Sequence, residues 1–284
     1  ALLLYDLYPQ VLAQLGLPPV VLAPITALWC WANRRVFASA ERVFTLSEAM
    51  AAELRPAFAS DALWRRKLVV IPPWADTNRL QPNPAAAAAF RYKQGIDSGR
   101  LLITYSGNLG LTHPLEPLVD AAALLAAAQV QLLLIGDGPK RVALEQRATA
   151  LQLPPLSLRF LDPLPLDELP ASLSAADLAV VALDGPAASA SLPSKTFSAL
   201  ACGTPLLALA PATSALAQLV QFHGCGVLIE PGPAAATGLA AAITALAADR
   251  SRLQQLAANA LAASRHYTPA NAERLLDAWL GADP

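Results

Sequence analysis

The chain has 284 residues, which is long enough for two compact units with separate hydrophobic cores. Apolar residues make up 55% and charged residues 14%, a composition that excludes a largely disordered chain. Because 20 Lys and Arg residues stand against 21 Asp and Glu residues, the net charge of -1 leaves no basic footprint for tight nucleic-acid binding and favours a small-molecule partner.

The three cysteines, Cys30, Cys202 and Cys225, stand at unrelated spacings. They form neither a Cys-x-x-Cys zinc pattern nor a disulfide framework, so we predict a reducing, cytoplasmic setting and no metal site. The chain begins at Ala1, inside an apolar run and without a basic leader, and we therefore expect upstream sequence to be missing.

The first notable segment, residues 7–33, contains no Asp, Glu, Lys or Arg. A membrane span needs about 20 uninterrupted apolar residues. Only residues 25–32 form an unbroken apolar piece, so we expect a helix between residues 25 and 38 that is buried in a core rather than placed in a membrane. Docking of the region near Trp29 and Trp31 on lipid stays open. Four prolines interrupt the segment: Pro9, Pro18, Pro19 and Pro24.

Short strands are expected at residues 1–6 and 42–46, with a further apolar run at residues 67–71. The hydroxyl of Ser47 can cap a helix that follows the second strand. The sequence Pro72-Pro73-Trp74 fixes the backbone, and we place a domain boundary there. We expect the residues before this boundary to form an incomplete sheet.

From residue 101 onward, apolar runs alternate with segments of helical periodicity, and the alanine run 85–89 just before them also favours helix. This alternation predicts a parallel α/β sheet whose strands are buried on both faces. A final amphipathic helix, 268–280, has an apolar side that needs something to cover. The expected strands are 101–106, 130–135, 156–161, 178–183, 205–210 and 226–229, and the expected helices are 115–128, 140–151, 166–174, 194–201, 214–222, 234–249 and 251–266.

Ligands of such sheets bind outside the carboxyl ends of the strands, so the loops there are the candidate sites. The loop from Gly107 to His113 opens a helix, and its glycines permit close approach to a phosphate. It lacks the G-x-G-x-x-G fingerprint, and a tight turn with Asn108 as a cap is an equal alternative. For His113 alone, a solvent-facing residue is the more common outcome than a phosphate donor.

Two further loops carry cations at helix starts. In the loop that contains Gly136 and Gly138, Lys140 and Arg141 oppose the helix dipole, which an anionic ligand would relieve, although exposed cations tolerate it at a cost of about 0.3 to 1 kcal/mol. In the third loop, hydroxyls and a lysine crowd a helix N-terminus. There we favour a diphosphate seat over an ordinary Ser cap with a solvated lysine. Its residues are Ser194, Lys195 and Thr196.

Four sequence blocks follow one another along the chain: YSGNLGLTHPLE, LLLIGDGP, LPLDELPASLSAADLAVV and LPSKTFSALACGTPLLA. In this order they resemble the GT4 family of GT-B glycosyltransferases, in particular the subgroup that makes bacterial surface polysaccharides. The resemblance implies a GT-B fold with a partial acceptor-side domain at residues 1–72, a Rossmann-like donor-binding domain at 73–266, and a C-terminal helix at 267–284 that crosses back to the N-terminal domain. Such relatives normally carry roughly another half domain before these segments.

The resemblance also implies a reaction. A sugar would pass, with retention of configuration, from a nucleotide-diphosphate sugar, for which the resemblance favours a UDP-sugar, to a lipid-linked or saccharide acceptor. No metal and no further cofactor is expected, and the protein would work in the cytoplasm, with possible attachment to the inner membrane face. Asn108 and His113 stand where many relatives have an Arg and a Lys on the diphosphate. The matched donor-binding set is Gly107, Asn108, His113, Gly136, Gly138, Lys140, Ser194, Lys195, Thr196 and Ser198.

The chain departs from the family at the E-x7-E pair, which falls on Ala190 and Ser198. Ser198 keeps a short hydrogen-bonding group where the second Glu normally holds the donor ribose, whereas Ala190 offers nothing ionic. On the acceptor side, Asp6 could orient an acceptor or simply cap a strand end. Two alternatives therefore stay open beside glycosyl transfer, namely a non-hydrolysing UDP-sugar 2-epimerase and a non-catalytic nucleotide-sugar-binding subunit.

Overall fold

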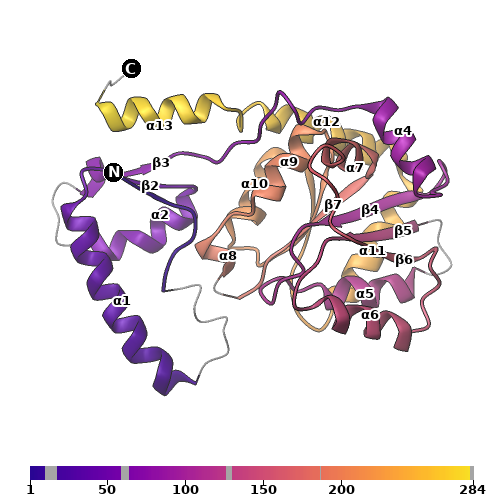
Figure 1. The fold of residues 1–284 in the computed structure, drawn as a ribbon, viewed down its shortest axis with the longest axis horizontal. Helices are drawn as coiled ribbons and strands as arrows, with labels where there is room; N and C mark the ends of the chain where they lie inside the picture. Colours follow the sequence, from indigo (N-terminus) through magenta and orange to yellow (C-terminus); the bar gives the residue numbers. More distant parts are fainter. Residues whose placement is uncertain (10–17, 59–63, 126–129, 186, 282–284) are drawn as a thin grey trace.

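The structure is a computed structural model, and it describes residues 1–9, 18–58, 64–125, 130–185 and 187–281. The described chain forms two lobes, each built on its own parallel sheet, with the last helix reaching from the second lobe to the first (Figure 1). The sheets lie on either side of the boundary predicted near residue 72. The predicted domain limits themselves stay a prediction.

The first lobe has a three-stranded parallel sheet in the order β1-β2-β3. Its helix α2 begins as expected, because the Ser47 Oγ accepts a hydrogen bond from the Met50 backbone N–H at 3.2 Å. The third strand corresponds to the apolar run before Pro72. The elements are β1 (Leu2–Leu4), α1 (Pro19–Ser39), β2 (Val43–Thr45), α2 (Glu48–Leu54), the 3-10 turn Arg55–Phe58, α3 (Trp64–Lys67) and β3 (Leu68–Val70).

Helix α1 corrects the expectation that the apolar segment before residue 38 is buried. The helix begins at Pro19 and passes through Pro24, and its side chains Val20, Leu28 and Trp31 are 80%, 67% and 54% exposed. Length explains the exposure, because 21 helical residues extend about 31 Å whereas a three-residue strand extends about 10 Å. The short sheet covers only part of α1, as Figure 1 shows.

The second lobe has a six-stranded parallel sheet in the order β6-β5-β4-β7-β8-β9, which is a doubly wound arrangement with its switch point between β4 and β7. All six strands expected from the apolar runs are present. The elements are α4 (Pro84–Lys93), β4 (Leu101–Ser106), α5 (Glu116–Leu124), β5 (Val130–Ile135), α6 (Arg141–Ala150), β6 (Leu158–Leu161), α7 (Leu169–Ala175), β7 (Leu178–Ala182), α8 (Ala187–Ala190), α9 (Ser194–Ala201), β8 (Leu206–Leu209), α10 (Ala215–His223), β9 (Gly226–Ile229), α11 (Ala235–Ala248), α12 (Arg250–Ser264) and α13 (Ala270–Leu280).

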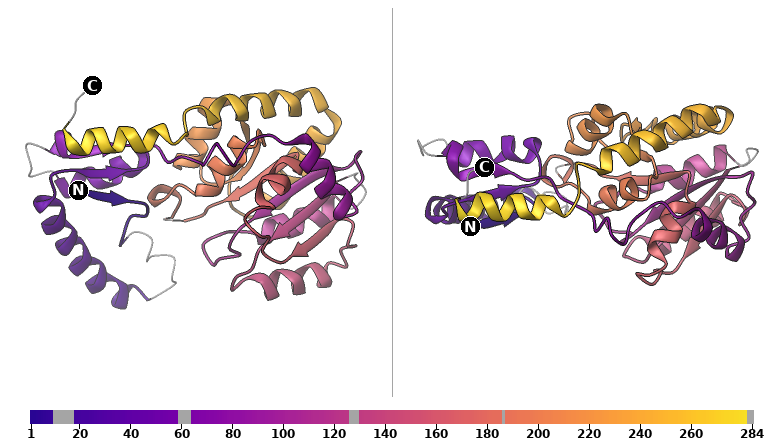
Figure 2. Two further views of the ribbon diagram at one scale, coloured as in Figure 1. Left: turned by 45° about the horizontal axis from the view of Figure 1, so that its top comes forward. Right: turned by 90° about the horizontal axis from the view of Figure 1, so that it is seen from above.

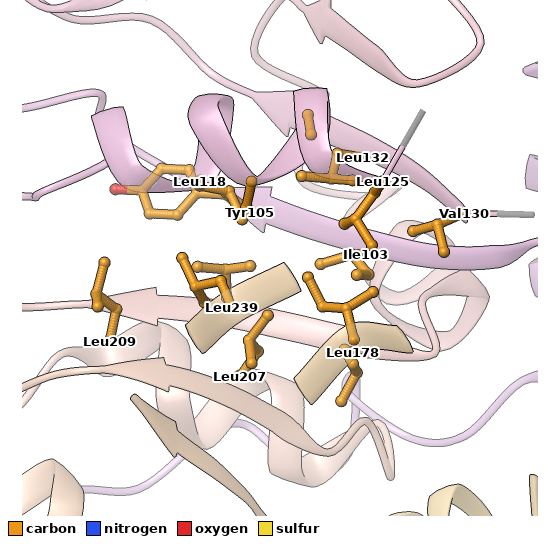
Figure 3. Close-up of a cluster of buried hydrophobic side chains, with 14 of the residues drawn as sticks. Ile103, Tyr105, Leu118, Leu125, Val130, Leu132, Leu178, Leu207, Leu209 and Leu239 are labelled. Atoms are coloured by element: carbon orange, nitrogen blue, oxygen red, sulfur yellow. The ribbon is translucent and has the colours of Figure 1, made fainter. Parts of the chain in front are cut away.

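Helices cover both faces of this sheet, so its strands are buried on both sides. On one face, α5, α6 and α11 pack on alternate residues of β4, such as Ile103 and Tyr105. On the other face, α9, α10 and α12 pack on β7 and β8, and α4 and α7 pack near Leu102. Tyr105 lies at the end of the first cluster, with its hydroxyl directed away from the aliphatic side chains (Figure 3). The core therefore ends in a polar atom at the carboxyl end of β4.

Apart from the linker near Pro72, the lobes are joined by α13, by backbone contacts of residues 6 and 7, and by the packing of α2 on α8 and α10. Helix α13 runs alongside the first lobe (Figure 2), where the Arg42 Nε donates to the Ala278 carbonyl at 3.1 Å. Its apolar side is covered only in part, since Leu276 and Trp279 are each about half exposed.

The lobes also meet at the end of the first strand segment. The Leu7 N–H donates to the Ala190 carbonyl at 3.0 Å, and Asp6 forms a backbone bridge with Ser191. The first-lobe residues 6 and 7 thus touch the loop that leads into α9.

Candidate functional site

The loops after β4 and β5 are hydrogen-bonded into one platform. The Gly107 N–H donates to the Ile135 carbonyl at 2.9 Å, and the Leu109 N–H donates to the Asp137 carbonyl at 2.8 Å. The Lys140 N–H returns to the Leu109 carbonyl at 3.0 Å. Sequence alone suggested two separate glycine turns, whereas the structure shows that each turn holds the other in place.

Glycine is required where the two loops touch. Gly136 has φ +139° and a Cβ there would collide with the carbonyl oxygen of Gly107. Gly138 has φ +149° and its Cβ would lie 2.5 Å from the Asn108 Oδ1 and 2.7 Å from the Leu109 carbonyl oxygen. Both the φ angles and the close backbone contacts exclude a side chain at these positions. The glycines of the predicted site therefore build its floor.

Lys195, from the first turn of α9, lies directly above this floor. A Cβ at Gly107 would lie 3.0 Å from the Lys195 Nζ. The ammonium donates to the Tyr105 Oη at 2.7 Å and lies 3.9 Å from the centre of the Tyr105 ring, while the Tyr105 Oη donates to the Asn108 carbonyl at 2.6 Å. Asn108, Gly138 and Lys195 thus come together, although they are far apart in the sequence.

Lys195 has no carboxylate partner among the residues that the structure describes. Its pKa is lowered to about 7 because burial disfavours the charged ammonium. Burial also raises the pKa of its neighbour Tyr105, so this hydroxyl stays protonated. A half-buried cation without a counterion is costly, and an anionic ligand would remove that cost.

A cavity of about 390 Å³ opens beside Lys195, between the two lobes. No side chain caps the N-terminus of α9, so the first amides of this helix and the Ser194 hydroxyl stand at the cavity wall. Uncapped helix N-termini attract anions through their free N–H groups and the helix dipole. The lining residues are Tyr5, Asp6, Thr112, His113, Leu183, Ser191, Leu192, Pro193, Ser194 and Lys195.

His113 is half-buried in this cavity rather than solvent-facing, as the isolated residue had suggested. Its Nδ1 lies 3.1 Å from the Thr112 Oγ1. Its pKa is lowered to about 4, first by burial and then by the positive charges of Lys195 and Lys140. At neutral pH the ring is uncharged, so it can donate one hydrogen bond to a ligand but adds no net charge to the empty site.

The cations of the second loop are already neutralised by the protein. Lys140 pairs with Glu116 at 2.9 Å and also donates to the His113 carbonyl at 2.9 Å. Arg141 pairs with Glu145 at 2.7 Å and with Asp162 at 3.2 Å. The dipole mismatch expected from the sequence is therefore relieved internally. Of the predicted cations, Lys195 is the one left for an anionic ligand.

The remaining residues of the third loop are placed unequally. Thr196 is fully buried and its Oγ1 has no hydrogen-bond partner, so this hydroxyl does not face the cavity. Ser198 is half-buried, one turn after Ser194 and Lys195 on the same side of α9. Ala190 is fully buried in an apolar cluster that contains Leu7. A carboxylate at position 190 would be enclosed by apolar side chains, which gives a physical reason for the first departure from the family pattern.

Asp6, for which the sequence predicts an acceptor-side position, lies at the cavity wall and is the one carboxylate among the lining residues given above. Partial burial raises the pKa of its carboxyl group. The backbone bridge to Ser191 fixes Asp6 next to the loop that carries Lys195. The structure thus brings Asp6 to the same cavity as the donor-side residues.

Sequence reasoning missed a second cavity, of about 350 Å³, on the other side of Gly107 and Asn108. It is closed by apolar residues after β6, including Pro163, Leu164 and Leu166. The signal was present, because a proline directly after a buried strand places a rigid turn at the carboxyl edge of the sheet. Tyr105 was missed as well, because it reads as an ordinary strand residue.

The profile of the family described as Glycosyl transferases group 1 matches residues 87–262, which is more than half of the chain. The chain belongs to the group 1 glycosyl transferase family. WcaI of Escherichia coli, whose name assigns it to glycosyl transfer in colanic acid biosynthesis, is 31% identical over 166 residues, or 58% of this chain and 40% of WcaI. The D-inositol 3-phosphate glycosyltransferase of Geodermatophilus obscurus is 30% identical over 263 residues, or 88% of this chain and 54% of that protein.

Two solved structures share the fold of this chain. The Anabaena protein HepE in complex with UDP aligns with a TM-score of 0.76 at 22% identity, and the alignment covers 99% of this chain and 71% of HepE. Sucrose-phosphate synthase from Thermosynechococcus elongatus aligns with a TM-score of 0.74 at 23% identity over 89% of this chain and 61% of that one. The predicted α/β fold of GT-B type is therefore confirmed. The chain spans about half the length of the curated relatives named above.

The described residues contain neither a candidate membrane-spanning helix nor a candidate metal cluster. None of their helices is both long enough and apolar enough to cross a bilayer. Within the same ranges, no group of three or more His, Cys, Asp or Glu side chains is placed to hold a metal ion.

Proposed function

We propose that this chain binds a nucleotide-diphosphate sugar, a UDP-sugar, and transfers the sugar with retention of configuration to a saccharide or lipid-linked acceptor in cell-surface polysaccharide synthesis. The observation that carries the proposal is Lys195, a half-buried ammonium with no carboxylate partner among the described residues, held above the Gly107 floor at the uncapped start of α9. The names of the relatives, a UDP complex and a colanic acid glycosyl transferase, support the donor and the pathway class.

The geometry supports one orientation for the donor. The diphosphate would lie between the Gly107 loop and the first turn of α9, where Lys195, Ser194 and the free amides can donate to its oxygens. The base would enter the apolar cavity closed by Leu164. Ser198 would then meet the ribose, and the sugar would extend toward Asp6, which would orient the acceptor hydroxyl. In the transition state, the negative charge that grows on the leaving diphosphate is stabilised by these same fixed donors, so the proposal assigns no metal or cofactor.

Product analysis tests this function and separates it from the two alternatives. We expect the full chain, incubated with UDP-sugars and saccharide or lipid-linked acceptors, to form a glycoside with the donor's anomeric configuration. An altered sugar on free UDP would instead identify a 2-epimerase, and tight UDP binding with no product would identify a binding subunit. The Lys195→Ala variant is the control, because any product that it forms at the wild-type rate does not arise in this cavity.

We further propose that the protein works at the cytoplasmic face of a membrane and contacts anionic lipid through α1. The helix exposes Leu28, Trp29 and Trp31 and carries Arg34 and Arg35 but no carboxylate. The Arg35 guanidinium lies 4.4 Å from the centre of the Trp31 ring. Exposed tryptophans beside cations are typical of surfaces that lie in the bilayer interface.

Vesicle sedimentation tests this contact. We expect wild-type protein to sediment with anionic vesicles and the double variant Leu28→Ala/Trp31→Ala to lose most of this binding. Tyr92→Ala is the matched control, because Tyr92 is 90% exposed on α4 of the other lobe. Equal sedimentation of all three proteins would contradict the assignment of α1.

A further inference from the structure

A cavity of about 490 Å³ lies at the root of α13, away from the donor site. It is open to solvent and is lined by the end of α10, the end of α12, the start of α13 and the linker residue Pro72. Because α10 leads into β9, its last residue lies at the amino end of that strand, whereas the donor loops lie at the carboxyl ends. The two cavities share no lining residue.

Positive and titratable groups dominate the cavity at the root of α13. Arg265 and Arg274 line it together with His223, His266, Tyr267 and Phe222, and its wall contains no carboxylate. Neither arginine forms an ion pair with any residue that the structure describes. Other arginines of this lobe, such as Arg250 and Arg252, also form no ion pair with a described residue, but Arg265 and Arg274 lie at the wall of one cavity.

Several polar groups of this cavity contact one another. The His223 Nε2 lies 3.0 Å from the Tyr267 Oη, and the rings of His223 and His266 are 5.4 Å apart. Burial and then the neighbouring His266 lower the pKa of His223. The Arg274 Nη1 donates to the Asn271 Oδ1 at 3.2 Å, and the buried Asn271 amide donates to the His266 carbonyl at 2.9 Å. An anion placed here would meet the Arg274 guanidinium, which is oriented by Asn271.

We propose that this cavity is a binding site for a soluble phosphorylated small molecule. A guanidinium group binds a phosphate through two parallel N–H···O hydrogen bonds, and imidazole N–H groups add further donors. A volume of about 490 Å³ exceeds that of phosphate alone and falls in the usual range for small organic ligands. The exposed ring of Phe222 and the ring of Tyr267 provide an apolar wall for the organic part.

The cavity lies at the joint between the two lobes, so a ligand bound there would affect how the lobes are arranged. The Ala75 N–H of the interlobe linker donates to the Tyr267 carbonyl at 3.0 Å, and the Asn271 amide reaches the Pro73 carbonyl at 3.4 Å. Both contacts join the linker to the root of α13, which leads to the first lobe. A ligand that bridges Arg265 and Arg274 would tie α12 to α13 across this joint and so stabilise one arrangement of the lobes.

Histidine signals in NMR spectra distinguish the two cavities, because the chain has three histidines. His113 reports on the donor site, whereas His223 and His266 report on the cavity at the joint. We would titrate inorganic pyrophosphate into the full chain with Lys195→Ala, which weakens the donor site. Saturable shifts of the His223 and His266 signals are expected, since a bound anion favours the protonated imidazole and changes its shift. Signals are assigned with His223→Asn and His266→Asn.

The decisive variant is Arg265→Gln/Arg274→Gln in the same background, where the midpoint for the His223 and His266 signals should move to at least about tenfold higher pyrophosphate. Arg250→Gln/Arg252→Gln removes the same charge at the other end of α12 and should titrate unchanged. The proposal is wrong if the His223 and His266 signals do not move, or if both double variants titrate alike. Both arginine pairs are exposed, and the spectra themselves report whether each variant is folded.

Discussion

Replacing Lys195 with alanine is expected to weaken UDP and UDP-sugar binding by roughly 10- to 150-fold, because a charge-assisted phosphate contact contributes about 1.5 to 3 kcal/mol. The free energy of unfolding should change little, since the Lys195 ammonium has no carboxylate partner among the described residues. Isothermal calorimetry of the full chain measures the effect directly. An affinity within twofold of wild type would show that the diphosphate does not lie above Gly107.

Lys140→Ala is the matched control for this prediction. Both lysines stand near the start of a helix at the carboxyl edge of the same sheet, but Lys140 already pairs with Glu116. The charge of Lys140 is already largely neutralised by Glu116, so donor affinity should fall by less than about threefold when Lys140 is removed. If Lys140→Ala and Lys195→Ala weakened binding equally, general electrostatic attraction and not a specific contact would explain both.

The pH dependence gives a second reading of the same contact. Burial lowers the pKa of Lys195 to about 7 in the empty protein, and a bound diphosphate favours the charged form and raises this pKa. The complex therefore takes up a proton when the free protein is deprotonated. Above about pH 7, the dissociation constant should rise by up to about tenfold per pH unit, and below it should level off. Lys195→Arg keeps its charge throughout, so any binding that it retains should lose this slope.

Local pattern and long-range pairing explain what could be predicted from the sequence. The six strands of the second lobe could be predicted because runs such as VQLLLI are apolar on both faces. The pairing of Lys140 with Glu116 could not, because these residues are 24 positions apart and only the fold brings them together. The burial of α1 was predicted wrongly for a related reason. Its composition suits a core, but the extent of the sheet beside it decides how much of it is covered.

The candidate site shows the same division. Glycines at strand ends correctly marked the loops, because φ near +140° and close backbone contact leave a clear residue signature. The sequence could not show that Lys195 donates a hydrogen bond to Tyr105, since this tyrosine lies near the end of an ordinary apolar strand. In the sequence, Ala190 marks the loss of the first glutamate of the family's E-x7-E pair. Its burial beside Leu7 shows that the position serves contact between the lobes.

The contact between the two glycine loops leads to the second large effect. Gly136→Ala should lower the free energy of unfolding by about 2 to 5 kcal/mol, because the new methyl group meets the Gly107 carbonyl and alanine strains the backbone at φ +139°. Urea denaturation of the full chain measures this loss. Gly99→Ala is the control, since a Cβ there has no neighbour within 4 Å, and its stability should change by less than about 1 kcal/mol.

The same variant also separates the floor from the cation. In Lys195→Ala the loops keep their contact, so donor binding falls while stability is nearly unchanged. In Gly136→Ala the Gly107 loop must move, and because Lys195 lies directly above Gly107, donor affinity should fall along with stability. A Gly136→Ala protein that is destabilised but binds UDP as tightly as wild type would show that the diphosphate does not rest on this loop. The donor would then have to be placed elsewhere along the edge of the sheet.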